Sequence, residues 1–262
     1  CEHVFENYDE PANYDFLVSA GKLISEIERQ PLNLNMQSLK NSMFKPQVRS
    51  FWRKFRDTSP TVKYNLFGTK TGRLSTCSDS FPIHNMSREL RCVIEPTNDY
   101  LVELDFNAAE LRTLLALSGK QQPEEDIHDW HINNVFSGDE TRDEAKRKVF
   151  AWMYNPERRD AALDMMYDRQ AVLEKYFDGS QVSTCFGRTI PADRKHALNY
   201  IIQSTTSDLL LRRVLEIHKR LNNMRSYVSF CIHDNLVLDM RADECYLIPD
   251  IVKLFSSTDL GD

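Results

Sequence analysis

Several kinds of segment are missing from the 262-residue sequence, and each absence excludes a class of protein. No run approaches the ~18 apolar residues of a membrane span, and no charged-then-apolar signal peptide begins the chain. We therefore expect no membrane partner and an intracellular protein. The six cysteines include no C-x-x-C pair and are too sparse for a disulfide framework. We expect reduced, packed thiols instead of a zinc knuckle or a disulfide scaffold.

The composition is typical of a globular protein. Apolar residues make up 41% and charged residues 27%, which favours a sizeable core over disorder. At roughly 100 to 200 residues per domain, the length allows one large domain or two modest ones. The net charge of −6 argues against a generally basic coat for nucleic acid.

Positive charge is nevertheless concentrated between residues 40 and 73. Nine lysines and arginines in this segment are opposed only by Asp57, which gives a local net charge of +8, and six aromatic residues lie among them. An acidic chain with one such basic stripe can bind a polyanion there. The alternative is an ordinary solvated helix face.

The order of periodic segments predicts an α+β fold. Strands and helices alternate without the regularity of βαβ units. Thr141 and Glu144 form the capping box of one predicted helix. Further helices are expected over residues 16–30, 108–118 and 196–221 and after 243. Strands are expected over 61–68 and 100–106, and two more over 227–240 form a hairpin that is joined at 233–235 with Asp234-Asn235 at its tip.

Two of the predicted strands end in an aspartate. Asp105 ends a strand expected to be buried, and Asp234 lies at the hairpin turn. A carboxylate at the end of a buried strand is costly unless something compensates it. Two such carboxylates can hold a pair of Mg²⁺ ions about 4 Å apart, with Mn²⁺ as a substitute, and this arrangement suits phosphoryl transfer. The alternative is that the aspartates cap a helix and a turn.

The helix that begins after Thr141 carries cations and aromatic rings on one face. Arg142, Lys146, Phe150 and Tyr154 recur every four residues. Cations near a helix N-terminus are disfavoured by the dipole, so an anion such as a triphosphate is expected to offset them. The rings would stack on a base and sugar. The alternative is a salt-bridged amphipathic helix.

Taken in order, these residues resemble the polymerase core of the family A DNA polymerases, which include bacterial DNA polymerase I and phage replicative polymerases. The resemblance implies a right-hand polymerase fold with an antiparallel palm sheet, helical fingers and a reduced or truncated thumb. Six motifs carry it: TGRLS at 71–75 followed by His84-Asn85, DFNAAELR at 105–112, DIH at 126–128, the frame of Arg142, Lys146, Phe150 and Tyr154, the helix of Asn199 and Gln203 with Ser207-Asp208, and His233-Asp234.

The resemblance also implies a role for each matching residue. Asp105 and Asp234, with the Phe106 carbonyl, would bind the metal ions, and Lys146 would act with the aspartates in catalysis. Glu110 would select deoxynucleotides by filling the space of a ribose 2′-hydroxyl. The incoming nucleotide would further be contacted by His128, Arg142, Lys146, Phe150 and Tyr154, and the primer–template DNA by Arg73, Asn85, Asn199, Gln203 and His233.

Several of these residues have a structural alternative. Glu110 could pair with Arg112 or Arg73, and Arg73 could form a structural salt bridge. His128 could cap a helix, and His233 could be only a turn residue. Asn199 and Gln203 could be a solvated pair on one helix.

The sequence departs from the family at two informative positions. Asn235 stands where the family has the glutamate of HDE, which removes a charge but keeps a hydrogen-bond acceptor. Asn155 stands where a glycine usually follows the tyrosine, which puts the exit of that helix in doubt. The expected division is a residual thumb or N-terminal helical region over 1–65, first palm part over 66–125, fingers over 126–195 and second palm part over 196–262.

The resemblance predicts template-directed extension of a primer with dNTPs, by a protein located with DNA inside the cell or, if phage-encoded, in the host cytoplasm. The expected partners are primer–template DNA and dNTPs, with replisome proteins or further domains of a longer chain as candidates. One alternative is a phage-type single-subunit RNA polymerase, which Glu110 opposes. Another is a catalytically silent primer–template-binding replication module, which the intact carboxylates and cations oppose.

Overall fold

The computed structural model of the protein describes residues 9–136 and 138–261. The start of the expected N-terminal region, residues 1–8, lies outside the described residues, as do Ser137 and Asp262. The chain forms two compact units. Within the described residues, the first unit contains 9–14, 106–209 and 258–261, and the second contains 15–105 and 210–257.

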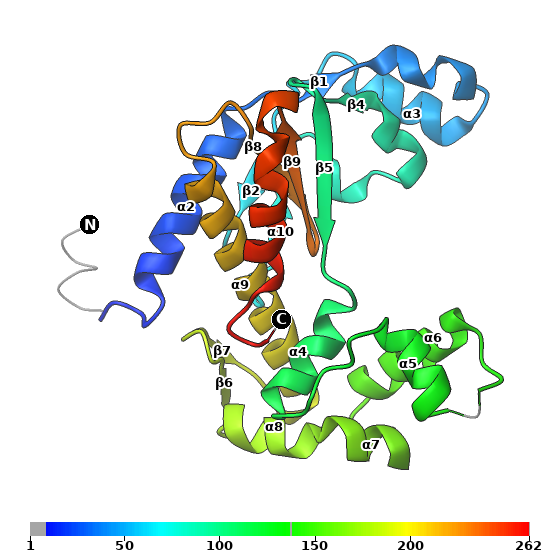
Figure 1. Ribbon diagram of the computed structural model, residues 1–262, viewed down its shortest axis with the longest axis vertical. Helices are drawn as coiled ribbons and strands as arrows, with labels where there is room; N and C mark the ends of the chain where they lie inside the picture. The colour runs from blue at the N-terminus through cyan, green and yellow to red at the C-terminus, as the bar shows by residue number, and fades with distance from the viewer. Residues whose placement is uncertain (1–8, 137, 262) are drawn as a thin grey trace. The chain divides into compact units, whose positions relative to one another are not determined.

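A three-stranded antiparallel sheet is the centre of the second unit (Figure 1). Its order is β5 (Tyr100–Asp105), β9 (Asn235–Met240), β8 (Tyr227–Ile232), so β5 and β8 are the edges. The expected hairpin is confirmed, but its turn is His233-Asp234, because Asn235 already pairs with Ile232 as the first residue of β9. His233 has a φ of 53°, the left-handed conformation that a tight turn requires.

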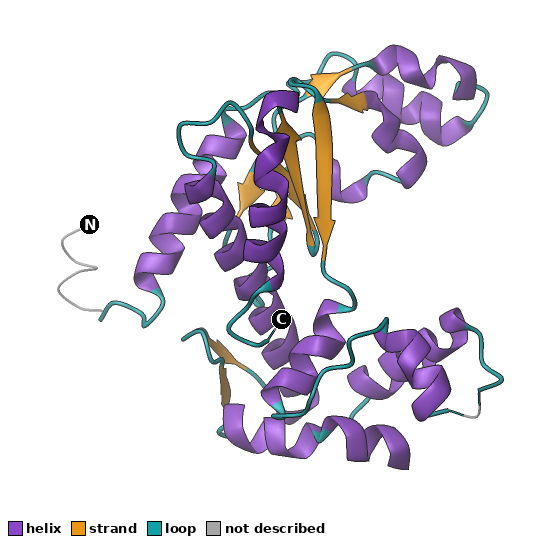
Figure 2. Ribbon diagram, in the orientation of Figure 1, coloured by secondary structure: helices purple, strands orange, loops and turns teal. Residues whose placement is uncertain are grey.

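The rest of the second unit consists of helices and short strand pairs. Figure 2 shows these pairs as small arrows beside the main sheet. The strand expected over 61–68 is only two residues long, because the Asn65 side chain accepts a hydrogen bond from the Phe67 amide and turns the chain. The elements are α2 (Tyr14–Glu28), β1 (Asn33–Leu34), a 3₁₀ helix (Met36–Ser42), α3 (Pro46–Phe55), β2 (Tyr64–Asn65), β3 (Ser75–Thr76), 3₁₀ helices (Ile83–Asn85 and Arg88–Val93), β4 (Ile94–Glu95), a 3₁₀ helix (Ala242–Leu247) and α10 (Ile248–Ser256).

The first unit is mainly helical, and α9 continues from it into the second. Its core gathers around Trp152 and Tyr167, which are fully buried. The expected capping box at Thr141 and Glu144 is confirmed, as is the mixed α+β character of the chain. The elements are α4 (Ala109–Leu117), α5 (Ile127–Asn134), α6 (Arg142–Tyr154), α7 (Ala161–Tyr167), α8 (Arg169–Tyr176), β6 (Gln181–Ser183), β7 (Thr189–Pro191) and α9 (Arg194–Arg220). None of the helices in the described part of the chain is long and apolar enough to cross a membrane.

Candidate functional site

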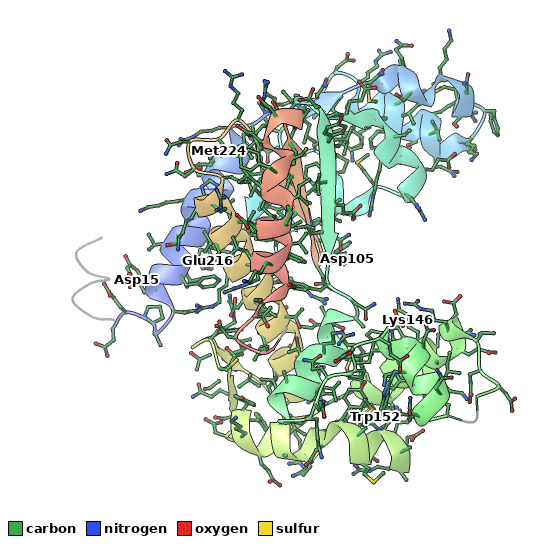
Figure 3. All side chains as sticks on the ribbon, in the orientation of Figure 1. Asp15, Asp105, Lys146, Trp152, Glu216 and Met224 are labelled. Atoms are coloured by element: carbon green, nitrogen blue, oxygen red, sulfur yellow. The ribbon has the colours of Figure 1, made fainter. Side chains whose placement is uncertain are left out.

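The strand register brings the two predicted aspartates to the same end of the sheet. Asp105 pairs directly with Asn235, the residue that follows Asp234 in the chain. Figure 3 labels Asp105 at this end of β5. Asp105 and the turn that carries Asp234 are therefore neighbours, although 129 residues separate them in sequence.

The expected burial of this site is wrong. Asp105 is exposed and Asp234 is half-buried. The reason is that β5 is an edge strand, so no further strand of the sheet covers its outer side at Asp105. An exposed carboxylate costs the fold little, so Asp105 does not need a metal ion to offset its charge. The argument for a metal site therefore depends on the chemistry of the donor atoms.

The donors at this end of the sheet fit Mg²⁺. Among the residues that the structure describes, no three histidine, cysteine or acidic side chains gather into a complete protein cage for a metal. Mg²⁺ prefers hard oxygen ligands and is usually held by one or two carboxylates together with waters and substrate phosphates. Two neighbouring aspartates match that requirement better than they match Zn²⁺, which prefers nitrogen and sulfur.

Asn235 makes a contact at this site that the sequence did not predict. Its Nδ2 atom donates a hydrogen bond to a carboxylate oxygen of Glu103. Glu103 lies on the same face of β5 as Asp105, because side chains two residues apart share a face. Asn235 was expected to contribute an acceptor, but here its donor is used, and a neutral amide lies between two acidic side chains.

This arrangement predicts how the sheet responds to a carboxylate at position 235. Asn235→Asp should lower the free energy of unfolding by about 1 kcal/mol, because it removes a hydrogen bond and sets like charges opposite one another. Adding Glu103→Gln should restore most of the loss, and salt should reduce it by screening. Urea denaturation of the two single variants and the double variant measures the coupling. Additive effects would show that positions 103 and 235 do not interact.

Two further side chains hold the hairpin near Asp234. The Tyr64 hydroxyl donates to the Cys231 carbonyl at 2.6 Å and accepts from the Cys231 amide at 2.8 Å. His84 stacks on His233 with ring centroids 5.2 Å apart. Burial, and then the proximity of His233, lower the pKa of His84. His233 is thus a turn residue that also packs against a neutral ring.

The two other residues of the second unit that were predicted to contact DNA are Asn85 and Arg73. Asn85 is exposed and follows His84 in a short 3₁₀ helix. Arg73 is half-buried, and its carbonyl accepts a hydrogen bond from the Thr69 hydroxyl at 2.9 Å. That bond closes a turn in which Gly72 has a φ of 75°, a conformation that glycine adopts without strain.

In the first unit, Asp126 organises the start of α6. One of its oxygens caps α5 by accepting from the His128 and Asp129 amides, which excludes His128 as the capping side chain. The other oxygen accepts from Arg142 at 2.7 Å and from Asn107 at 2.8 Å. Burial raises the pKa of Asp126, but the bonds from Arg142, Asn107 and the α5 backbone outweigh burial and hold the pKa well below its usual range. Asp126 is therefore an anion that offsets Arg142.

The aromatic face of α6 meets Glu110 and His128. The Tyr154 hydroxyl donates to the nearly buried Glu110 carboxylate. Phe150 stacks on Tyr154 with centroids 6.0 Å apart and lies 6.2 Å from the ring of buried His128. The expected alternative pairing of Glu110 with Arg112 is wrong, since the Arg112 guanidinium bonds the carbonyls of 107, 123 and 125.

Lys146 remains available on this face. It is exposed, whereas Trp152 of the same helix is fully buried (Figure 3). Its Nζ lies 6.0 Å from the centre of the Phe150 ring, and within the described residues it has no carboxylate partner. The structure therefore brings Glu110, His128, Lys146, Phe150 and Tyr154 together, with Arg142 bonded to Asp126 at the start of the helix.

The end of α6 does not need the missing glycine. Asn155 is extended, with φ −105° and ψ 106°, so the chain leaves the helix without a left-handed residue. The buried Arg169 bonds the carbonyls of Trp152 at 2.8 Å, Asn155 at 3.2 Å and Arg158 at 2.8 Å. Arg169 was not predicted as a structural residue, because the carbonyls that it bonds lie 11 to 17 residues earlier in the chain.

A cavity of about 290 Å³ lies beside this helix end. Tyr154 and Asn199 both line it, together with the cations Arg159, Arg194 and Lys195. The Asn199 Oδ1 atom is buried without a hydrogen-bond partner, so Asn199 is not half of a solvated pair. Gln203 is half-buried on the next turn, and Asp208 is fully buried and bonded by Arg188 at 2.7 and 3.0 Å.

The fold itself is known from a polymerase. The chain matches the structure of the POL domain of Pol1 from M. smegmatis in complex with DNA primer-template and dNTP, with a TM-score of 0.65 and 16% identity. The match covers 82% of this chain and 48% of that one. The fold class is therefore a mixed α+β fold like that of a polymerase domain.

Sequence comparison leads to the same family. The chain is 25% identical over 189 residues to the DNA polymerase of Mycobacterium phage D29, which covers 59% of this chain. It is 26% identical over 243 residues to the thermostable DNA polymerase I of Thermus aquaticus, which covers 73%. It spans only 31% and 29% of these two relatives, and no protein-family model matches it. The predicted resemblance is confirmed: the chain is a distant homologue of the family A DNA polymerases.

Proposed function

We propose that the protein is a DNA-dependent DNA polymerase that extends a primer with dNTPs. The observation that supports this most directly is the strand register, which sets Asp105 beside the turn that carries Asp234 at one end of an antiparallel sheet. The homologous polymerases and the primer-template and dNTP bound to the M. smegmatis domain add support. In this proposal, the sheet is the palm and the segment with α5 and α6 is the fingers.

The protein groups divide into those that hold metal and those that hold the nucleotide. Asp105, Asp234 and the Phe106 carbonyl would hold two Mg²⁺ ions, which when bound activate the primer hydroxyl and neutralise the charge that develops on the phosphates. Lys146 would contact the triphosphate, since it is exposed and has no carboxylate partner in the described part of the chain. Arg142 would also contact the triphosphate once its hydrogen bond to Asp126 is broken.

The remaining groups would position the base, the sugar and the duplex. Phe150 would pack on the nucleotide, and Tyr154 would help to place the template base. Glu110, held by the Tyr154 hydroxyl, would fill the space of a 2′-hydroxyl. Arg73, Asn85, Asn199, Gln203 and His233 would lie along the primer–template duplex, where contacts to shape and to common acceptors permit copying of any sequence.

Primer extension by the purified chain tests this proposal directly. On primed single-stranded DNA with Mg²⁺, we expect template-dependent incorporation of dNTPs and much less incorporation of NTPs, because Glu110 would exclude the 2′-hydroxyl. A preference for NTPs would instead identify a phage-type RNA polymerase. Tight binding to primer–template without incorporation would identify a catalytically silent replication module.

A further inference from the structure

The helix α3 carries a row of cations on one side, which we call the basic face. It consists of Arg49 and Arg53 with Trp52, extended by Lys45 directly before the helix and Arg56 directly after it. At 100° per residue these five positions fall within about 100° of the helix circumference, with Arg53 and Arg56 exposed and the other three half-buried. Val48 and Phe51 lie outside this arc and are buried, and Phe51 and Phe55 pack on Phe81 with centroids 6.1 and 5.9 Å apart. Core packing therefore fixes which side of α3 faces outward.

Two of the four cations of the basic face, Arg49 and Arg53, have no ion pair in the described part of the chain. Within the described residues, Arg53 is exposed and its guanidinium has no ion pair or hydrogen bond. Arg49 donates only to the neutral carbonyls of residues 43 and 44. Lys45 pairs with Glu89, and Arg56 pairs with an exposed Asp57. Lys40 and Lys54 add two more exposed cations close by.

Cations lie close to two aromatic rings of this segment. The Arg56 guanidinium lies 4.5 Å from the centre of the Trp52 ring, and Lys45 Nζ lies 5.8 Å from that of Phe44. A base that stacked on the Trp52 ring from this side would have to displace the Arg56 guanidinium, whereas Phe44 is 73% exposed. The face is therefore suited to phosphate groups, which cations bind directly, more than to unstacked bases.

We propose that the basic face of α3 binds the phosphate backbone of double-stranded DNA. Successive cations at i and i+4 are about 6 Å apart along the helix, so the face presents an extended row instead of a single anion site. Duplex DNA offers the densest line of charge to such a row, about one phosphate per 1.7 Å of axis.

The position of α3 makes this a separate contact from the aspartates. The strand pair β1–β4 joins the α3 segment to the chain just before Tyr100, at the far end of β5 from Asp105 (Figure 1). The six residues of β5 span about 17 Å, so the two places are well separated on the second unit. Binding at α3 does not depend on the proposed polymerase activity.

Duplex binding in the absence of Mg²⁺ and dNTPs tests the proposal. The probe is a fluorescent blunt-ended duplex, and its Kd is measured between about 50 and 200 mM NaCl. The variant Arg53→Gln/Arg56→Gln should bind at least about tenfold more weakly at the low-salt end, and the slope of log Kd against log salt should fall by about 1.8 for two lost phosphate contacts. Arg53→Gln alone, which leaves the Trp52 contact intact, should lower the slope by about 0.9.

The matched control is Lys22→Gln/Arg29→Gln, called the α2 variant, which removes one exposed cation from α2 and one directly after it in the same unit. It should keep the wild-type slope. Equal slopes of log Kd against log salt for wild type and the α3 variants would overturn the proposal. Equal losses of duplex affinity in the α2 and α3 variants would also overturn it, because they would indicate a general electrostatic effect. A single strand of the same sequence that binds as tightly as the duplex would overturn the assignment of the partner.

Discussion

Asp105→Asn and Asp234→Asn should each reduce Mg²⁺-dependent primer extension by about a thousandfold or more. Each variant replaces a metal-binding carboxylate with an amide of the same shape, and about 4 kcal/mol of lost transition-state stabilisation corresponds to that factor. The rate constant of single-nucleotide incorporation, measured under single-turnover conditions, checks this prediction. The variants should still bind primer–template DNA, because each change keeps the shape of the side chain and leaves the proposed DNA contacts in place.

The control for these variants lies at the opposite end of β5. Asp99 is exposed and accepts a hydrogen bond from the Ala242 amide at 2.8 Å, a bond that asparagine can also accept. Asp99→Asn makes the same change of charge on the same unit and should extend primers at the wild-type rate. Unchanged extension by either Asp105→Asn or Asp234→Asn would remove the polymerase proposal.

Arg169→Met should lower the free energy of unfolding by about 3 to 5 kcal/mol, because it leaves buried partners of a charged group without a donor. Arg169 is 7% exposed, and it bonds three backbone carbonyls and the Asp164 carboxylate. Its guanidinium also lies 4.0 Å from the centre of the Trp152 ring. Urea denaturation followed by circular dichroism measures the loss. Arg158→Met, an exposed change in the same loop, should cost far less.

Part of this loss should depend on pH. Burial raises the pKa of Asp164, but hydrogen bonds from Arg169, Trp152 and the Asp160 amide outweigh burial, so the pKa lies below its ordinary value of 3.8. A lowered carboxyl pKa stabilises the folded state above 3.8, and this stabilisation is lost as the pH falls through the folded pKa. The difference between wild type and Arg169→Met should therefore shrink in acid. A difference that stays constant from neutral pH to below 3.8 would show that the ion pair contributes nothing.

Local sequence patterns predicted those parts of the fold that depend on interactions between residues close together in the chain. The capping box at Thr141 fixed the start of α6, and the apolar runs around His233-Asp234 predicted the hairpin. The predicted positions of Asp105 at the end of a strand and of Asp234 in the hairpin turn are also confirmed. Burial of Asp105 was predicted wrongly, because an apolar run does not reveal whether a strand lies at the edge of a sheet.

Contacts between distant segments could not be predicted in the same way. Tyr64 and Cys231 are 167 residues apart, and Glu103 and Asn235 are 132 apart. Neither pair belongs to a periodic pattern. Glu103 and Asn235 meet because β5 pairs with β9, whereas Tyr64 and Cys231 belong to different sheets that pack together. Arg169 is similar, since its role at the end of α6 depends on how α8 packs and not on its neighbours in the sequence.

The double hydrogen bond from Tyr64 to Cys231 also has a consequence for self-association. β8 is an edge of the sheet, and the outward amide and carbonyl of an edge strand can recruit a strand from another molecule. One phenol hydroxyl occupies both of these groups at Cys231. The Tyr64 hydroxyl therefore leaves neither backbone group of Cys231 available to pair with a strand from another molecule.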